Sequence, residues 1–460
     1  MGELQETVSI QITPTVSSQP IEQQDDWLPI TASRNGNTYY AAFHAVCSGI
    51  GVQALVLPVA FTILGWTWGI ICLAVMFLWQ LYTLWLLVHL HESQETGIRY
   101  SRYINLCEVA FGSKLGKLLA IPPITYLSAG TCMTLIIIGG STLNTFFEFA
   151  CGSTCTLKPL TPAEWYLVFT CIVVVLSQIP NMNSIAGVSL VSALTSIAYC
   201  TLIWVVSVEK GQVPEISYNP VRGNNETVTF FSILNALGII AFGFRGHNVI
   251  LEIQATMPSS EKHPSHVPMW KGVRIAYLII GMCMFPLSIG CYWAYGNMIP
   301  SNGGMLVAMY AFHSQDVSRL TIELMGLFII ISCVTSFPIY AMPTFDQIEA
   351  QYVTKFKRPC SWWLRSIIRT MTGFLIFFAA VALPYLGSVS GLIGASVLPV
   401  TLAFPSLMWI KIKKPLMYSK MWLLNWTLGV VGLTFSGILT VAGVYVLIND
   451  GIKWDFFNPH

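Results

Sequence analysis

The chain has 460 residues, of which 54% are apolar and only 10% are charged, and its formal net charge is +2. A soluble chain carries about 25% charged residues, so most of this protein's surface is expected to face lipid rather than water. The small net charge and the lack of a basic stripe interleaved with aromatic residues argue against a nucleic-acid-binding protein.

The N-terminal segment has the composition of a disordered tail. Residues 1–34 lack an apolar core and are rich in Ser, Thr, Gln and Pro, which is not the pattern of a cleavable signal peptide. The first membrane helix is therefore expected to act as its own insertion signal. A membrane domain is predicted over residues 35–448, followed by a short tail over residues 449–460.

Eleven apolar runs follow the tail, each long enough to cross a bilayer, which takes about 20 helical residues. Lipid offers no partner to backbone N–H and C=O groups, and the runs do not alternate apolar and polar residues as barrel strands do. An all-α integral membrane protein is therefore predicted, in which the eighth span has to accommodate Glu323. The runs lie near residues 38–63, 66–90, 115–148, 164–180, 186–207, 229–253, 271–295, 318–342, 366–384, 388–410 and 422–448.

Lysine and arginine are distributed unevenly between the connections. If the N-terminus is cytoplasmic, about 17 basic residues face the cytoplasm and about five face outside, as the positive-inside rule requires. This bias needs an odd number of spans and predicts an extracellular C-terminus. Asn225 begins an Asn-Glu-Thr glycosylation sequon in a connection that this topology places outside.

Twelve cysteines are scattered along the chain, most of them inside apolar runs. No CxxC pair occurs, which argues against a zinc, other metal or redox centre. Cys151 and Cys155 lie in a polar connection, where they form either a disulfide, if the connection faces an oxidising compartment, or two free thiols.

Glycines interrupt the first and the sixth span. The first contains Ser48-Gly49-Ile50-Gly51-Val52-Gln53, followed by Pro58, and the sixth contains Phe242-Gly243-Phe244-Arg245-Gly246-His247-Asn248. Each glycine costs about 1 kcal/mol relative to alanine inside a helix, and proline removes a backbone donor, so both helices are expected to unwind locally.

Interrupted helices at matched positions of two halves indicate an inverted-repeat transporter. Free N–H groups at such breaks suit a carboxylate and free carbonyls suit an ammonium group, as an amino acid would need. The alternative for any single glycine is close packing of helices in lipid.

Several motifs carry a resemblance to a known family. They are Ala42-Phe43-His44, Leu57-Pro58, Leu64-Gly65-Trp66 and the segments Pro180–Ser189, Gly246–Ser259, Pro268–Val273 and Met342–Asp346. These motifs resemble the plant lysine/histidine transporter-like branch of the amino acid/auxin permease family.

The resemblance implies an eleven-helix fold of the amino acid–polyamine–organocation type. It would consist of repeats over about 38–207 and 229–410 and an extra helix over about 422–448. It also implies amino acid uptake coupled to protons across the plasma membrane, with the proton gradient in place of any cofactor.

The chain departs from the family pattern at both breaks. It has Gly51-Val52-Gln53 where the family usually has Gly-Ala-Gly, and Arg245 where small or aromatic residues are usual. A charge in a span usually faces the bundle interior, so Arg245 either pairs with a substrate carboxylate or forms a structural pair with Glu252 or another carboxylate. Gln53 either contacts the substrate or ties the unwound segment together.

Candidate substrate-binding residues lie at the two breaks and in the third span. They are Ser48, Gly49, Ile50, Gly51, Gln53, Thr131, Phe242, Gly243, Phe244 and Arg245.

Three residues are candidates for proton coupling. His44 and His247 titrate near physiological pH unless they are bonded to a neighbouring helix. An intramembrane carboxylate such as Glu252 tends to stay protonated until it is paired, although Glu252 lies near the cytoplasmic end of its span and could instead pair with a basic loop residue. The hydroxyls of Thr335 and Ser336 either coordinate a cation or bond backbone freed by Pro338.

The resulting hypothesis is secondary active transport of amino acids, neutral ones first and cationic ones as a further class, by proton symport through a lipid bilayer. The alternatives are a carrier of auxin-like organic acids and a nutrient receptor that does not accumulate its ligand. A channel would need a repeated pore helix or filter, and an enzyme would need a motif such as GxSxG, a P-loop or HExxH, none of which occurs. No sequence feature specifies an oligomeric state.

Overall fold

The computed structural model describes residues 34–93, 97–151, 160–179, 186–301 and 303–450. The predicted tail, apart from Arg34, and residues 451–460 lie outside these ranges. Within them the protein is almost entirely helical, with β pairing limited to one isolated bridge between Glu92 and Arg99.

The helices match the predicted spans. Nine helices of the described ranges are long and apolar enough to cross a membrane. Helix α3, of 39 residues, is divided at Gly65, where φ is 72°, and so contributes to two spans instead of one. Helix α6 is a shorter apolar helix of 15 residues and adds one more span. The described ranges therefore contain eleven spans. In chain order the spans are α2 (Thr38–Gly49) with the start of α3 (Val52–Leu90), the rest of α3, α5 (Ser113–Cys151), α6 (Pro162–Leu176), α7 (Ala186–Lys210), α8 (Glu226–Gly243) with α9 (His247–Ala255), α10 (His266–Tyr295), α12 (Arg319–Phe356), α13 (Trp362–Ala382), α14 (Leu386–Leu398) with η3 (Pro399–Ala403) and α15 (Phe404–Lys413), and α16 (Lys420–Asp450).

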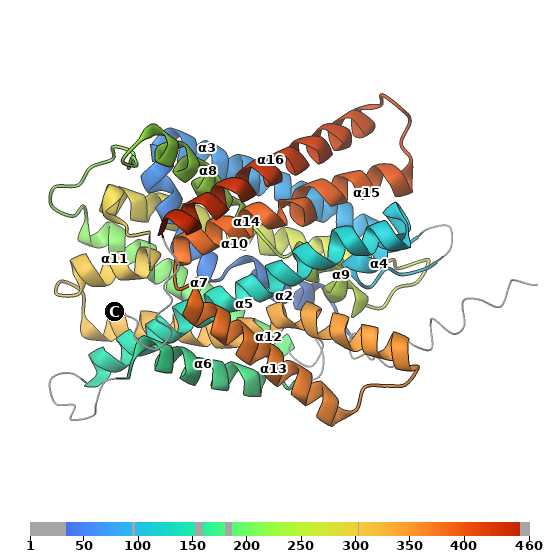
Figure 1. Ribbon diagram of the computed structural model, residues 1–460, viewed down its shortest axis with the longest axis horizontal. Coiled ribbons are helices and arrows are strands. Elements are labelled where there is room, and N and C mark those ends of the chain that lie inside the picture. Colours follow the sequence, from blue (N-terminus) through green and yellow to red (C-terminus); the bar gives the residue numbers. More distant parts are fainter. Residues whose placement is uncertain (1–33, 94–96, 152–159, 180–185, 302, 451–460) are drawn as a thin grey trace, which may run out of the picture.

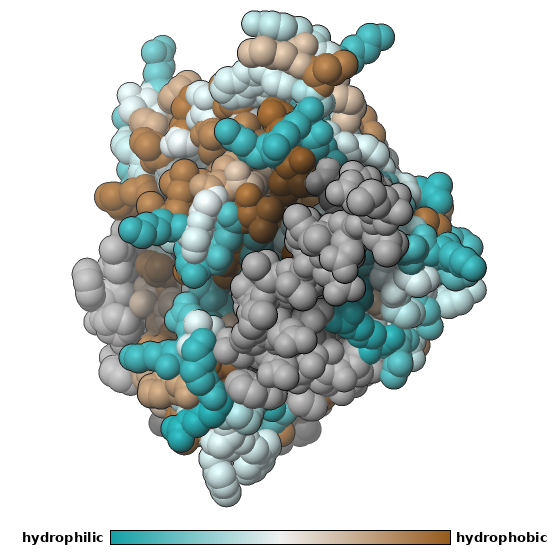
Figure 2. Space-filling view, turned by 90° about the vertical axis from the view of Figure 1, so that its right-hand side faces the viewer, coloured by the Kyte–Doolittle hydropathy of each residue, from teal (hydrophilic) through white to brown (hydrophobic). Residues whose placement is uncertain are grey.

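Short helices lie in the connections between spans. The spans cross the molecule side by side, with α11 (Gly304–His313) at one end and α4 (Tyr103–Phe111) at the other (Figure 1). A 3₁₀ turn, η2 (Gly296–Met298), follows α10. Figure 2 looks onto the end that carries α4 and shows many hydrophilic residues there, as expected where a chain leaves the apolar interior of a bilayer.

The eighth span accommodates its acidic residue at its first turn. Glu323 lies four residues after Arg319, the first residue of α12, and its carboxylate accepts a hydrogen bond from Arg319 Nε at 2.7 Å. Both side chains are partly exposed. The charge is therefore neutralised at the end of the span rather than inside it, and the helix continues 14 residues beyond the predicted limit of 342, to Phe356.

The contacts of the first and sixth spans repeat with an offset of five spans. In the first span, α2 packs on the fifth span (α7) and on the seventh (α10). In the sixth span, α8 packs correspondingly on the tenth span (α14) and on the second (α3). This is the arrangement expected of two inverted repeats. The repeat boundaries near 38–207 and 229–410 stay predictions.

Glycines bring α8 and α14 into backbone contact. A Cβ atom at Gly394 would overlap the carbonyl oxygen of Gly238, and one at Gly391 would overlap the side-chain amide of Asn235. Small residues permit such approach in membranes, where close packing replaces the hydrophobic effect as the source of helix association.

The tenth span depends on the eleventh for one hydrogen bond. Pro399 lacks the N–H that would bond the Ala395 carbonyl in a continuous α-helix, and a π-helix of five residues begins at this proline. Ser436 of α16 donates its hydroxyl to that carbonyl at 2.9 Å. The irregularity in this span is therefore satisfied by a neighbouring helix.

Candidate functional site

The two predicted breaks are present and meet inside the bundle. The first span is interrupted between Gly49 and Val52, and the sixth between Gly243 and His247. A Cβ atom at Gly246, whose φ is 128°, would lie 3.1 Å from Ser48 Oγ, and one at Gly51 would lie 3.8 Å from Arg245 Nη2. The unwound segments are thus direct neighbours, and the predicted site residues Ile50, Phe242 and Phe244 are buried beside them.

Arg245 lies between the breaks and is only 2% exposed. Its Nη1 donates to Thr131 Oγ1 of α5 at 2.7 Å, and its Nη2 donates to Gln53 Oε1 of α3 at 2.5 Å. The guanidinium carbon lies 4.1 Å from the ring centroid of Phe242 and 4.6 Å from that of Tyr340, distances at which aromatic faces attract a cation.

The partners of Arg245 are neutral. Among the described residues no carboxylate lies within 4.0 Å of its guanidinium. The expected alternative of a structural ion pair with Glu252 is therefore not seen in this conformation. Instead, Arg245 joins the predicted site residues Gln53 and Thr131.

Three carbonyls of the first break accept from side-chain donors. Gln53 Nε2 donates to the Gly49 carbonyl at 2.8 Å, so Gln53 ties the unwound segment together while it also holds Arg245. Tyr199 of α7 donates to the Gly51 carbonyl at 2.8 Å, and Tyr340 of α12 donates to the Ser48 carbonyl. Sequence reasoning missed both tyrosines, because nothing local distinguishes them from other tyrosines in apolar helices.

The helix N-termini at the breaks are uncapped. Gly51 precedes α3 and Gly246 precedes α9, and neither residue has a side chain that could accept from the first N–H groups of its helix. Such ends carry unsatisfied donors and the positive end of the helix dipole. Together with Arg245, they make the site rich in hydrogen-bond donors, while the C-terminal ends of α2 and α8 lie at the same breaks.

The two candidate histidines are bonded to neighbouring helices. His44 Nδ1 and Ser189 Oγ share a hydrogen bond at 2.7 Å, and His247 Nε2 and Thr83 Oγ1 share one at 2.9 Å. Both rings are buried. These contacts match the structural alternative weighed for each histidine.

The two candidate hydroxyls of the eighth span have different partners. Thr335 donates to the carbonyl of Ile331, one turn earlier, at 2.7 Å. Ser336 Oγ shares a hydrogen bond with Ser192 Oγ of α7 at 2.8 Å. Thr335 therefore bonds its own helix, whereas Ser336 joins two helices.

Glu252 belongs to a charged cluster at the α4 end of the bundle. Arg102, just before α4, forms an ion pair with Asp346 of α12, and Glu252 interacts electrostatically with both. All three side chains are buried. The Arg102–Asp346 pair was not predicted, although Asp346 ends the motif Met342–Asp346.

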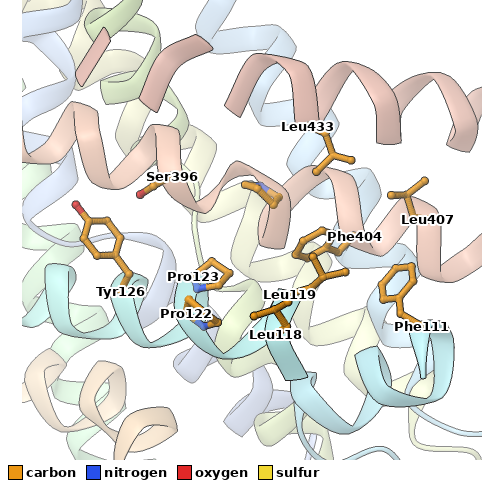
Figure 3. A pocket seen from close by; sticks show the side chains of 11 residues that line it. Phe111, Leu118, Leu119, Pro122, Pro123, Tyr126, Ser396, Phe404, Leu407 and Leu433 are labelled. Carbon is orange, nitrogen blue, oxygen red and sulfur yellow. The ribbon is translucent and has the colours of Figure 1, made fainter. Parts of the chain in front are cut away.

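Two further predictions concern the connections, and a groove lies beside the third span. Asn225 is exposed and caps α8 by accepting from Val228 N at 2.8 Å. Cys151 is disulfide-bonded, whereas Cys155 lies outside the described residues, so their pairing stays a prediction. Tyr126 of α5 does not face the breaks but lines a separate apolar groove of about 630 Å³ between α5 and α14–α15 (Figure 3).

Comparisons with known proteins agree with this architecture. The family model described as transmembrane amino acid transporter protein matches residues 34–449. Lysine histidine transporter-like 8 of Arabidopsis thaliana is 54% identical over 439 residues, which cover 95% of this chain and 84% of the relative. Lysine histidine transporter-like 7 of the same plant is 44% identical over 95% of this chain and 90% of its own.

Among solved structures, a substrate-bound, outward-open Na⁺-coupled sialic acid symporter superposes with a TM-score of 0.57 at 12% identity, covering 94% of each chain. This likeness confirms the predicted all-α fold, and the breaks of the first and sixth spans are seen in the helices of this protein itself. The relatives are transporters by name, and the protein is not an enzyme. The chain belongs to the family of transmembrane amino acid transporter proteins.

Proposed function

We propose that this protein is a secondary active transporter that carries amino acids into the cytoplasm together with protons. The observation that carries the proposal is the meeting of two unwound helices around buried Arg245. The N–H groups of α3 and α9 would receive the substrate carboxylate. The site is closed to solvent in the present conformation, since the Gln53 side chain is 1% exposed and that of Thr131 is 0% exposed.

Transport needs the site to open to each side in turn. At the α4 end, the buried pair between Arg102 and Asp346 joins the connection before α4 to α12 and would have to separate. At the opposite end, a cavity of about 280 Å³ leads between α3, α8 and α14, with Asn235 and Arg222 on its wall. We assign these two ends to release and entry.

We further propose that the α4 end faces the cytoplasm and that the membrane is the plasma membrane. Arg102, just before α4, and Lys114 and Lys117, at the start of α5, lie at this end, and the positive-inside rule places lysine and arginine in the cytoplasm. Asn225, at the start of α8, would then lie outside, where glycosylation takes place.

Glu252 is the proposed proton carrier. It is 4% exposed, and its Oε2 has no hydrogen-bond partner within the described ranges. Because it lies beside the Arg102–Asp346 pair, separation of that pair would change the charge that Glu252 experiences and so its affinity for a proton. The histidines are weaker candidates, since each is already bonded to a hydroxyl.

Uptake of an amino acid panel into proteoliposomes with an imposed pH gradient tests the proposal. We expect accumulation that disappears when a protonophore collapses the gradient. Glu252→Gln should abolish gradient-driven accumulation and retain exchange of substrate across the membrane, whereas Glu323→Gln, at the exposed start of α12, should behave as the wild type. Accumulation that persists without the gradient would refute proton coupling, and the absence of any uptake or exchange would refute transport.

A further inference from the structure

The charge of Arg245 is not balanced by the protein around it. Its two hydrogen-bonded partners are the amide oxygen of Gln53 and the hydroxyl of Thr131, and its Nε has no partner within the described part of the chain. A buried ion without a counter-ion is strongly disfavoured unless something else supplies the opposite charge.

The backbone of the first break offers little of that charge. The carbonyls of Ser48, Gly49 and Gly51 already accept from Tyr340, Gln53 and Tyr199. The uncapped starts of α3 and α9 add N–H groups, which are donors. A substrate with a cationic side chain would therefore meet like charge at Arg245 and occupied acceptors on the first break.

The donors of the site form two sets. The first set consists of the N–H groups that begin α3 and α9, and the second is the guanidinium of Arg245. If the carboxylate shared by all amino acids meets the helix ends, Arg245 keeps only neutral partners. A second carboxylate on the substrate would complete the site.

We infer that the preferred substrates are net-negative molecules with two carboxylates, namely acidic amino acids and related dicarboxylic acids. The side-chain carboxylate replaces Gln53 Oε1 on Arg245 Nη2, which turns a bond to a neutral amide into a charge-assisted one. Thr131 continues to hold Nη1 and so keeps the guanidinium in place. This inference rests on the proposed transport function, and it concerns the substrate class of the same site.

Two measurements on the full-length protein test the inference separately from transport. The first is the shift in melting temperature of purified wild-type protein with glutamate, aspartate, glutamine, lysine or indole-3-acetate. We expect glutamate or aspartate to stabilise it at concentrations at least about tenfold lower than glutamine, and lysine and the monocarboxylate to do so least. Equal or better stabilisation by glutamine, lysine or indole-3-acetate, or none by either acidic amino acid, overturns the inference.

The second measurement is competition for uptake in wild-type and Arg245→Gln proteoliposomes. The variant should lose its preference for glutamate over glutamine by a factor of at least about ten while it still takes up glutamine. An unchanged preference overturns the inference. If Arg245→Gln does not fold, Arg245→Lys is the alternative variant. Lysine keeps the positive charge but lacks the planar N–H groups of the guanidinium, so this variant should retain the preference for acidic substrates at reduced affinity. Acid-selective stabilisation without any uptake would support this substrate class and refute the proposed transport.

Discussion

Arg245 and Gln53, 192 residues apart in sequence, join the two broken helices through a hydrogen bond of 2.5 Å. The same Gln53 side chain donates to the Gly49 carbonyl within its own break. One neutral amide thus sets both the conformation of the first break and the position of the buried charge.

Replacing Gln53 with glutamate should block the site. The new carboxylate would lie where the amide oxygen now accepts from Arg245 and would act as a permanent counter-ion, but it could no longer donate to the Gly49 carbonyl. A hydrogen bond to a charged group contributes about 1.5–3 kcal/mol and a neutral one about 0.5–1.5 kcal/mol, so we expect a melting temperature close to that of the wild type together with a loss of uptake of at least about tenfold. Gln53→Ala is the control, because it removes both bonds and should lower stability and uptake together. Wild-type uptake by the Gln53→Glu protein would show that Arg245 does not meet the substrate.

Separating Arg102 from Asp346 should open the α4 end of the bundle. Losing one partner of a buried ion pair typically costs about 3–5 kcal/mol, so Asp346→Asn should favour conformations in which the two elements part. We expect faster alkylation of Cys47, a fully buried residue of α2, by a small maleimide, mapped by mass spectrometry. Arg319→Ala, which breaks a largely exposed pair with Glu323, should leave the rate unchanged. An unaltered rate in Asp346→Asn would exclude this pair from the closure.

The backbone contact between α8 and α14 should not tolerate one added methyl group. Gly394→Ala would place a Cβ atom onto the Gly238 carbonyl oxygen, and we expect a large loss of folded protein, measured by fluorescence-detected size exclusion. Gly437→Ala in α16 meets nothing within 4 Å and should be neutral or stabilising by up to about 1 kcal/mol. Equal yields of the two variants would contradict the observed approach of the helices.

Glycosylation of Asn225 would report the orientation of the chain. The residue is exposed and begins a sequon, so deglycosylase should increase the gel mobility of protein made in glycosylating cells. Thr227→Ala should abolish this shift while it leaves the Asn225 cap of α8 intact. Asn224→Gln, outside the sequon, is the matched control. An unshifted wild-type band would weaken the proposed topology.

Sequence alone predicted the spans and both breaks because the signals for them are local. Apolar runs identify helices in lipid, and glycine and proline act on the backbone where they stand. The short helices α4 and α11 were not predicted, since they lie in connections and are too short to form spans.

The contacts inside the site could not be predicted in the same way. Tyr340 reaches the Ser48 carbonyl across 292 residues, and Tyr199 reaches that of Gly51 across 148. Both pairs depend on how helices distant in sequence are rotated against each other. That Arg245 needs a partner follows from burial, but that the partners are Gln53 and Thr131 follows only from the packing of three helices.

The hydrogen bond from the Ser436 hydroxyl to the Ala395 carbonyl also affects the order in which the bundle can be assembled. The tenth span leaves the ribosome with a proline-freed carbonyl, and its donor lies on the last helix to be synthesised. Until α16 enters the membrane, that carbonyl lacks its serine partner in a medium that offers no water. The last bond of the tenth span therefore forms only after the eleventh span has been made, and a chain truncated before α16 would leave the Ala395 carbonyl without its serine partner.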